Sequence, residues 1–154
     1  MQANLDERQI EYLLKHKLLG HLGCYADNIS YVIPICYVYD GQYIYGRTYE
    51  GMKIKMIRKN PNVCFQVENI ENMAKWQSAI CWGEFEELTD KAERNKAVSL
   101  LRDRISATIE SSALRQSNYW PFSVDDLDDV KGILFRIHIN TKTGKSSFYD
   151  EYQV

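Results

Sequence analysis

Residues 43–65 of the chain read YIYGRTYEGMKIKMIRKNPNVCF. The aromatic and apolar residues at the beginning predict a strand over 43–47, and a short polar link leads from it to a helix over 52–59. Asn60 and Pro61 end that helix, because asparagine tolerates the left-handed cap position and proline cannot continue a helix. A second strand begins directly after them. We expect the rest of the chain to be arranged around this unit.

The helix predicted over 52–59 carries a lysine on its apolar side. At about 100° of rotation per residue, Lys53 falls within the same arc as Met56. A lysine in the first turn is also repelled by the positive end of the helix dipole. An anion held by Lys53, the free N–H groups of the first turn and Arg47 or Thr48 resolves both problems, which predicts a phosphate site. The alternative is a surface lysine whose stem lies on apolar side chains while its ammonium reaches water.

The composition is typical of a globular chain. Its 154 residues are 45% hydrophobic and 26% charged, so we expect one domain over residues 1–154 with a substantial core. The formal net charge of -2 argues against nucleic acid as the main partner, because no long basic face is present. Residues 1–9 are polar, and no apolar run approaches the roughly 20 residues that cross a bilayer. We therefore expect neither a signal peptide nor a membrane partner.

The cysteines and histidines show no pattern of a metal site. No two cysteines form a C-x-x-C pair, and the three histidines lack metal-ligand spacing. All the cysteines lie in apolar, strand-like runs, at Cys24, Cys36, Cys64 and Cys81. This predicts buried, reduced thiols and a cytoplasmic location.

The remaining pattern predicts strands joined by short links. A helix over 5–19 begins with a capping box at Asp6 and ends at Gly20, and another helix begins at Asp90. Residues 115–130 are expected to form a loop or a cover segment. The predicted strands lie at 21–25, 29–39, 42–47, 62–68, 76–88 and 132–139, with a short one within 141–148. Short links favour antiparallel pairing, so we expect a small closed or partly open barrel of about six strands.

Pro34 interrupts the strand predicted over 29–39. Because proline cannot donate to a ladder, it predicts a sheet edge or a place where the sheet opens. An opening would leave neighbouring N–H groups, such as those of Ile35 and Cys36, free for the acceptors of a ligand. The alternative is a proline at a bulge that only bends the strand.

Several short segments, in this order and spacing, carry a resemblance to a known family. They are GHLG at 20–23, VIPI at 32–35, YIY at 43–45, GMK at 51–53, NPNV at 60–63, WQSAI at 76–80, Gly83 and TGK at 143–145. The chain resembles the FMN-binding split-barrel proteins related to pyridoxamine 5′-phosphate oxidase, in the branch that includes the nitroimidazole-resistance reductases. The resemblance covers residues 8–90 well and the last strand weakly.

The resemblance implies a mainly β (α+β) fold, a six-stranded antiparallel split β-barrel with peripheral helices. It also implies an FMN-binding oxidoreductase that acts on a small molecule at a homodimer interface. The flavin phosphate would lie at the strand-to-helix turn and the ring along the strand that contains Pro34, while the second subunit supplies Trp76 and Ser78. The implied cofactor-binding residues are Pro34, Ile35, Cys36, Tyr37, Gly46, Arg47, Thr48, Met52, Lys53, Trp76 and Ser78.

The chain departs from the pattern of its relatives at two positions. Met52 stands where an arginine is common, and neither Gly46 nor Met52 is the histidine of the nitroimidazole-resistance reductases. No catalytic acid or base is identified, since the flavin supplies the redox chemistry. Two alternatives remain open: a flavin carrier or sensor without turnover, and a split-barrel protein that binds haem or a deazaflavin. His21 would be the candidate haem ligand.

Overall fold

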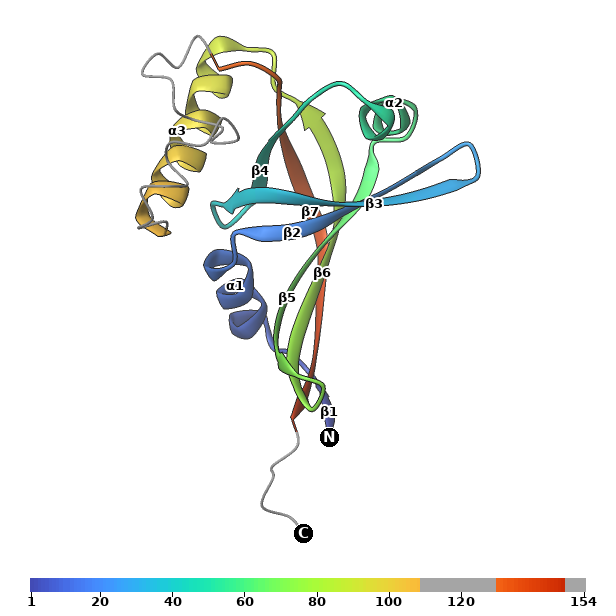
Figure 1. The fold of residues 1–154 in the computed structure, drawn as a ribbon, viewed down its shortest axis with the longest axis vertical. Coiled ribbons are helices and arrows are strands. Elements are labelled where there is room, and N and C mark those ends of the chain that lie inside the picture. Colours follow the sequence, from blue (N-terminus) through green and yellow to red (C-terminus); the bar gives the residue numbers. More distant parts are fainter. Residues whose placement is uncertain (109–129, 149–154) are drawn as a thin grey trace.

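The computed structural model describes residues 1–108 and 130–148. It contains seven strands and three helices, and Figure 1 shows their arrangement. Its elements are β1 (Gln2–Asn4), α1 (Glu7–His16), β2 (Leu19–Ala26), β3 (Ile29–Tyr39), β4 (Tyr43–Thr48), α2 (Met52–Lys59), β5 (Asn62–Asn72), β6 (Lys75–Glu87), α3 (Lys91–Thr108) and β7 (Ile133–Phe148).

Six of the strands form a ring. The order within the sheet is β7-β4-β3-β2-β5-β6, and β6 pairs with β7 to close it. Every pairing is antiparallel. The prediction of a six-stranded antiparallel barrel is therefore confirmed, with β1 added along the edge of β7 as a seventh strand that the sequence did not indicate. Figure 1 shows β5, β6 and β7 along the long axis of the molecule, and α2 at the end opposite the N-terminus.

The boundaries of the first helix differ from the prediction. The capping box of Asp6 is present, but α1 ends at His16 and not at Gly20. Gly20 lies in β2, where an added Cβ atom would be 2.2 Å from Cζ of Phe65. The glycine therefore allows close packing of a strand against an aromatic ring and does not end a helix. In the sequence, a glycine that ends a helix cannot be distinguished from a glycine that allows close packing within a strand.

The link predicted over residues 69–75 is also different. Strands β5 and β6 extend into it and meet in a tight turn, because Oδ1 of Asn72 accepts hydrogen bonds from the N–H groups of Ala74 (2.8 Å) and Lys75 (2.9 Å). The last two predicted strands are one long strand, β7. The loop predicted over 115–130 lies outside the described residues except for Val130.

The core has two parts on either side of the barrel wall. The larger part fills the barrel and is closed by Leu13 and Leu14 of α1. The smaller part lies between α3 and the outer surface of β3, β4 and β7, and includes Tyr45 and Leu101. α3 and α1 thus cover different surfaces of the barrel and leave the outer surface of β2, β5 and β6 open (Figure 1).

Tyr37 joins α1 to the barrel. Its side chain is fully buried, and its hydroxyl donates a hydrogen bond to the carbonyl of Leu14 (2.6 Å). That carbonyl lies in the last turn of α1, where no partner within the helix exists. We expect Tyr37→Phe to lower the free energy of unfolding by about 1–2 kcal/mol, because a buried acceptor loses its donor. Urea denaturation measures this change, and Tyr12→Phe on the exposed side of α1 is the control. Equal stability of the two variants would contradict the role of the hydroxyl.

The cysteines are not all buried. Cys24 and Cys81 are buried, Cys64 is partly exposed and Cys36 is exposed. The prediction of four buried thiols is thus wrong for Cys36, because residues alternate between the two faces of β3 and Cys36 lies on the outer one. Among the described residues, no helix is both long and apolar enough to cross a membrane.

Candidate functional site

The ring of strands opens between β3 and β4. These strands pair only over residues 37–39 and 44–46, although β3 pairs with β2 over its whole outer half, residues 29–36. Within the described part of the chain, the second edge of β3 therefore has no strand partner over 29–36. Pro34 lies in this edge. The prediction that this proline marks an opening of the sheet is confirmed, since a residue without an N–H fits where no ladder forms.

The direction of the backbone groups on this edge follows from one hydrogen bond. The N–H of Tyr37 donates to the carbonyl of Leu18 (3.0 Å), toward the β2 side. Successive residues of an antiparallel strand direct their backbone groups to opposite sides. The N–H of Cys36 and the carbonyl of Pro34 therefore face the open edge. The N–H of Ile35 faces β2, so the expectation that it is free for a ligand is wrong.

The turn from β4 to α2 borders the same opening. Arg47 is half-buried, donates from Nη1 to the carbonyl of Lys131 (3.4 Å), and places its guanidinium 5.2 Å from the ring centroid of Tyr49. Thr48 is buried. α2 begins after Gly51, which has no side chain that could cap the first turn. The first N–H groups of α2 thus have no side-chain acceptor within the described residues.

Gly46 belongs to the barrel wall. An added Cβ atom would be 2.5 Å from Cζ of Phe135 and 3.2 Å from Cγ2 of Ile35. The position therefore requires the smallest side chain for packing on the inner face. Gly46 was predicted to bind the cofactor, and it precedes Arg47 in the chain. Its own Cα faces the core of the barrel.

Lys53 differs from the other cations of α2. It is half-buried, and the first turn contains no acidic residue. Burial and the neighbouring Cys64 raise the pKa of the Cys24 thiol in β2, and the ammonium of Lys53 opposes that rise. Arg58, in contrast, forms an ion pair with Glu50 (2.7 Å) on the exposed side of the helix. Within the described residues, Lys53 has no ion pair, while Met52 beside it is exposed.

The predicted residues fall into two groups. Those of β3, β4 and α2 surround the opening, although the side chains of Ile35 and Tyr37 point into the core and offer only backbone. Trp76 and Ser78 lie near the start of β6, opposite Ile70 and Glu68 of β5. Figure 1 shows the hairpin of β5 and β6 at the end of the barrel opposite α2. A single chain does not bring them to the turn between β4 and α2.

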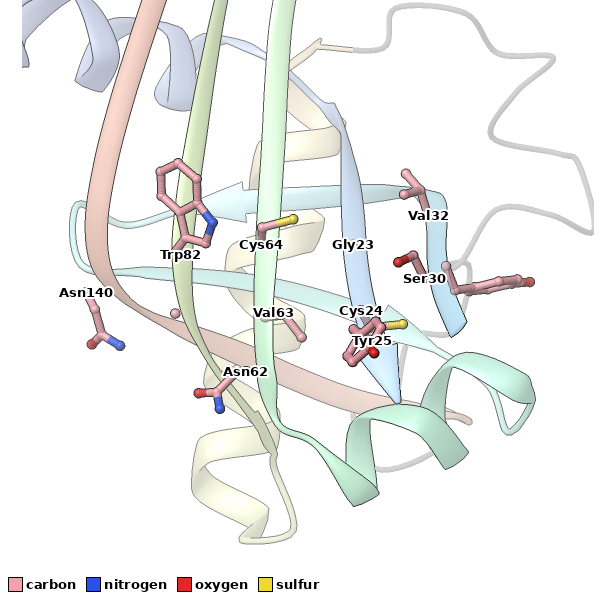
Figure 2. A pocket seen from close by; sticks show the side chains of 12 residues that line it. Gly23, Cys24, Tyr25, Ser30, Val32, Asn62, Val63, Cys64, Trp82 and Asn140 are labelled. Carbon is pink, nitrogen blue, oxygen red and sulfur yellow. The ribbon is translucent and has the colours of Figure 1, made fainter. Parts of the chain in front are cut away.

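A pocket of about 390 Å³ lies on the outer surface of the barrel, beside the open edge. Gly23 forms its floor, because a Cβ atom there would be 2.6 Å from Sγ of Cys64. Figure 2 shows the sulfur of Cys64 directed toward Gly23, with Trp82 on one side and Val32 on the other. The pocket combines apolar and aromatic walls with the polar groups of Ser30, Asn62 and Asn140.

Sequence reasoning did not assemble this pocket. Its residues come from β2, β3, β5, β6 and β7, and only the register of the sheet aligns them: Val32 opposes Gly23, Gly23 opposes Cys64, and Cys64 opposes Trp82. Glycines inside predicted strands were the available signal, since they often mark a close approach of another group.

His21 lies on the same outer surface and opposes Pro34 across the β2–β3 ladder. Its Nδ1 is 3.2 Å from Oε1 of Gln66, whose Nε2 donates to Oγ of Ser78 (3.0 Å). The histidine is thus part of a polar network that crosses three strands. The described residues contain no cluster of three or more potential metal ligands.

Comparison with known proteins identifies the family. The family described as pyridoxamine 5′-phosphate oxidase matches residues 6–129. The chain belongs to this family. An uncharacterized protein of Rhizobium meliloti (strain 1021) is 33% identical to this family member over 70 residues, which is 46% of each chain. The chain thus spans about half the length of that curated relative.

Solved structures similar to this pyridoxamine 5′-phosphate oxidase family member share its split barrel. An FAD-binding protein from Mesorhizobium loti is 26% identical with a TM-score of 0.72, over 96% of this chain and 99% of that one. A Bacteroides thetaiotaomicron VPI-5482 protein proposed to act in 5-nitroimidazole antibiotic resistance is 20% identical with a TM-score of 0.72, over 95% and 87%. An FAD- and haem-binding protein from Mycobacterium smegmatis is 17% identical with a TM-score of 0.66, over 97% and 76%.

Proposed function

We propose that this protein is a flavin-dependent oxidoreductase that acts on a small molecule. The observation that carries the proposal is the open edge of β3, which borders the basic turn between β4 and α2. One ligand with a hydrogen-bonding ring and an anionic tail occupies both places, and a flavin has this form. The flavin supplies the electron or hydride transfer, and the protein supplies binding and orientation.

The ring is assigned to the open edge because the two hydrogen-bonding patterns match. The pyrimidine side of an isoalloxazine carries acceptors and one N–H donor. The edge offers the N–H of Cys36 as a donor and the carbonyl of Pro34 as an acceptor, and proline adds no competing N–H. Because the neighbouring side chains point into the core, this contact depends on the backbone and tolerates different residues at these positions.

The phosphate is assigned to the turn between β4 and α2. Arg47 and Lys53 supply positive charge, Thr48 supplies a hydroxyl, and the first turn of α2 adds N–H groups. Arg47 already contacts Lys131 and Tyr49, so its guanidinium is held in place before a ligand arrives. The half-buried Lys53 is then the cation that binds the phosphate most directly.

We propose that two copies of the chain form the complete site. The outer surface beside the open edge exposes apolar side chains: Tyr25 (48%), Val32 (65%) and Trp82 (44%). Such a patch is typical of an interaction surface, and a symmetric dimer would cover it on both subunits. The second subunit would bring its Trp76 and Ser78 toward the ring, which one chain alone does not do. Light scattering at micromolar concentration tests the dimer.

We propose FMN as the flavin. FMN is also the part of FAD that extends to its first phosphate. The relatives named as FAD-binding support a flavin and are compatible with either cofactor. The relative named for nitroimidazole resistance supports a reductase of small aromatic molecules. In that case the outer-surface pocket would lie between the two subunits of the proposed dimer, and it would receive the substrate beside the ring with Trp82 as an aromatic wall.

Alkylation of the cysteines tests the position of the ring. We expect Cys36 to react first with iodoacetamide in the flavin-free protein, because its side chain is exposed. Cys81 is expected to react only on unfolding, since burial raises the pKa of its thiol to about 12. Added flavin should slow labelling of Cys36 at least several-fold while leaving Cys64 less affected. Mass spectrometry of the digested protein measures each rate, and unchanged Cys36 labelling at saturating flavin would contradict the assignment.

Turnover separates an enzyme from a flavin carrier. We expect NADH or NADPH to bleach the bound flavin without oxygen, and an added quinone or nitroaromatic compound to restore its colour. A flavin that dithionite reduces, but that no nicotinamide donor reduces and no acceptor reoxidises, would instead support a carrier or sensor. This experiment starts from the flavin-loaded protein and needs no variant.

A further inference from the structure

His21 borders the outer-surface pocket. It lies on β2 two residues before Gly23, the floor of the pocket, and both positions are on the outer side of the strand. Two residues of a strand span roughly 7 Å. Side chains stand roughly perpendicular to a sheet, so the imidazole ring of His21 rises at the edge of the space above Gly23.

Hydrogen bonds determine which nitrogen of His21 carries the proton. The carboxylate of Glu68 accepts hydrogen bonds, so the group of Gln66 that faces it at 2.8 Å is the amide nitrogen. The amide oxygen of Gln66 is then the atom that lies 3.2 Å from Nδ1 of His21. Because this oxygen can only accept, Nδ1 carries the proton and donates the hydrogen bond. In the neutral ring, Nε2 is left without a hydrogen and is an acceptor.

This acceptor is available to a ligand. Within residues 1–108 and 130–148, Nε2 of His21 makes no hydrogen bond, although the residue is half-buried. The ring lies between Pro34 and Gln66, which oppose His21 on the two neighbouring strands. A half-buried acceptor without a protein partner is satisfied by a donor from a ligand or from water. The pocket therefore has a hydrogen-bond acceptor at one edge.

The lining of the pocket favours an uncharged ligand. Val32 and Trp82 supply apolar and aromatic surface, and Ser30 and Asn62 supply uncharged polar groups. None of the lining residues is Asp, Glu, Lys or Arg. An ionised ligand would lose water on these walls without gaining a counter-charge, which costs free energy. A flat, uncharged ring instead gains by packing on Trp82.

We propose that the pocket selects uncharged aromatic molecules with an N–H or O–H group on the ring, and that His21 recognises this group. The ligand ring packs against Trp82, and its N–H or O–H donates a hydrogen bond to Nε2 of His21. Phenols and heteroaromatic rings with an N–H belong to this class. The inference rests on the proposed function, because that function makes the pocket the substrate site. His21 is thus a specificity-determining residue.

Indole and benzofuran form a matched pair of probes for this proposal. Both are flat, uncharged and nearly equal in size, but indole has an N–H where benzofuran has an oxygen atom. We expect indole to bind the purified protein about tenfold more tightly, the effect of one hydrogen bond. NMR titration of the ¹⁵N-labelled protein measures both affinities, and the N–H signals of Gly23 and of the Trp82 side chain locate the probes. Equal affinities would overturn the proposal.

His21→Phe tests the residue itself. We expect this variant to bind the two probes with affinities within about twofold of each other, because an aromatic ring remains and the acceptor is lost. His138→Phe is the matched control, because His138 lies two residues before Asn140 of the pocket but its ring centroid is 5.4 Å from that of Tyr43. The control should retain the preference for indole. A preference that persists in His21→Phe, or is lost equally in both variants, would overturn the role of His21.

The ¹⁵N chemical shifts of the imidazole ring test the position of the proton. We expect the neutral ring of His21 to carry its proton on Nδ1. Gln66→Leu should abolish this preference, because the acceptor for Nδ1 is removed while the histidine remains. A neutral ring with its proton on Nε2 in the unaltered protein would overturn the inference.

The outcomes separate this inference from the function on which it rests. A preference for indole that depends on His21, in a protein that takes up no flavin, would overturn the proposed function and support the selectivity of the pocket. Flavin turnover in a protein whose pocket signals do not respond to indole would support the function and overturn the inference. A haem absorption band that appears with added haemin and is lost in His21→Phe would also overturn it, because Nε2 would then bind iron.

Discussion

Lys53→Ala is expected to weaken flavin binding by on the order of 1.5–3 kcal/mol, which is roughly a ten- to hundredfold rise in the dissociation constant. The reason is the position of the lysine. It lies half-buried in the first turn of α2, and it forms no ion pair among the described residues. Removing it takes a charge-assisted contact from the phosphate without freeing a carboxylate elsewhere. Titration of the flavin-free protein with FMN measures the change.

Lys55→Ala is the matched control for this variant. Lys55 lies two residues further along α2 on the exposed side, so its loss changes the net charge equally but leaves FMN affinity as it was. Lys53→Arg should retain most of the affinity, since the positive charge remains. An equal loss of FMN affinity in Lys53→Ala and Lys55→Ala would mean that general attraction of anions, and not a contact of Lys53, accounts for the effect. Raising the salt concentration would then abolish the difference from the unaltered protein.

Gly83→Ala is expected to lower the free energy of unfolding by on the order of 3 kcal/mol. An added Cβ atom would lie 2.1 Å from the carbonyl oxygen and 2.9 Å from the carbonyl carbon of His138, and 3.1 Å from Cγ2 of Ile137. The first two are backbone atoms of β7, so no side-chain rotation relieves the contact. The register between β6 and β7 shifts at this point, which brings the two strands together. Urea denaturation followed by far-UV circular dichroism measures the loss.

Gly51→Ala is the control for the glycine variant. Gly51 has an extended backbone (φ 168°), and an added Cβ atom would meet nothing within 4 Å. We expect its stability to change by no more than about 0.5 kcal/mol. If Gly83→Ala were as stable as Gly51→Ala, the close approach of β6 and β7 at the shift of register would be wrong. A loss in both variants would point to a general cost of replacing glycine and not to this contact.

Much of the fold could be predicted from local patterns. Alternating apolar residues and the Asp40–Gly41 turn indicated the β3–β4 hairpin, and the helix 52–59 agrees in both bounds with α2. The boundaries that failed depended on distant contacts. Gly20 is required by the ring of Phe65, and Asn72 turns the chain within a segment whose polarity resembled a loop. In each case the competing interpretation was equally consistent with the local sequence.

The site was predictable only in part, for a similar reason. Pro34 indicated an open strand edge, and Lys53 indicated an anion near the first turn of α2. The direction of each N–H group along that edge depends on the register with β2, which cannot be read from one strand alone. The outer-surface pocket requires strands that are distant in sequence. Cys36 was placed on the wrong side because an apolar run does not reveal which of its residues face outward.

An absorption spectrum of the purified protein, with identification of the chromophore that it releases, tests the central claim most directly. The account predicts the two absorption bands of an oxidised flavin and the release of about one flavin per chain. This flavin is either bound during expression or taken up after addition to the flavin-free protein. A colourless protein that takes up neither FMN nor FAD would contradict it. The opening between β3 and β4 would then be a feature of the family fold without its cofactor, and Lys53 a lysine whose stem covers the barrel.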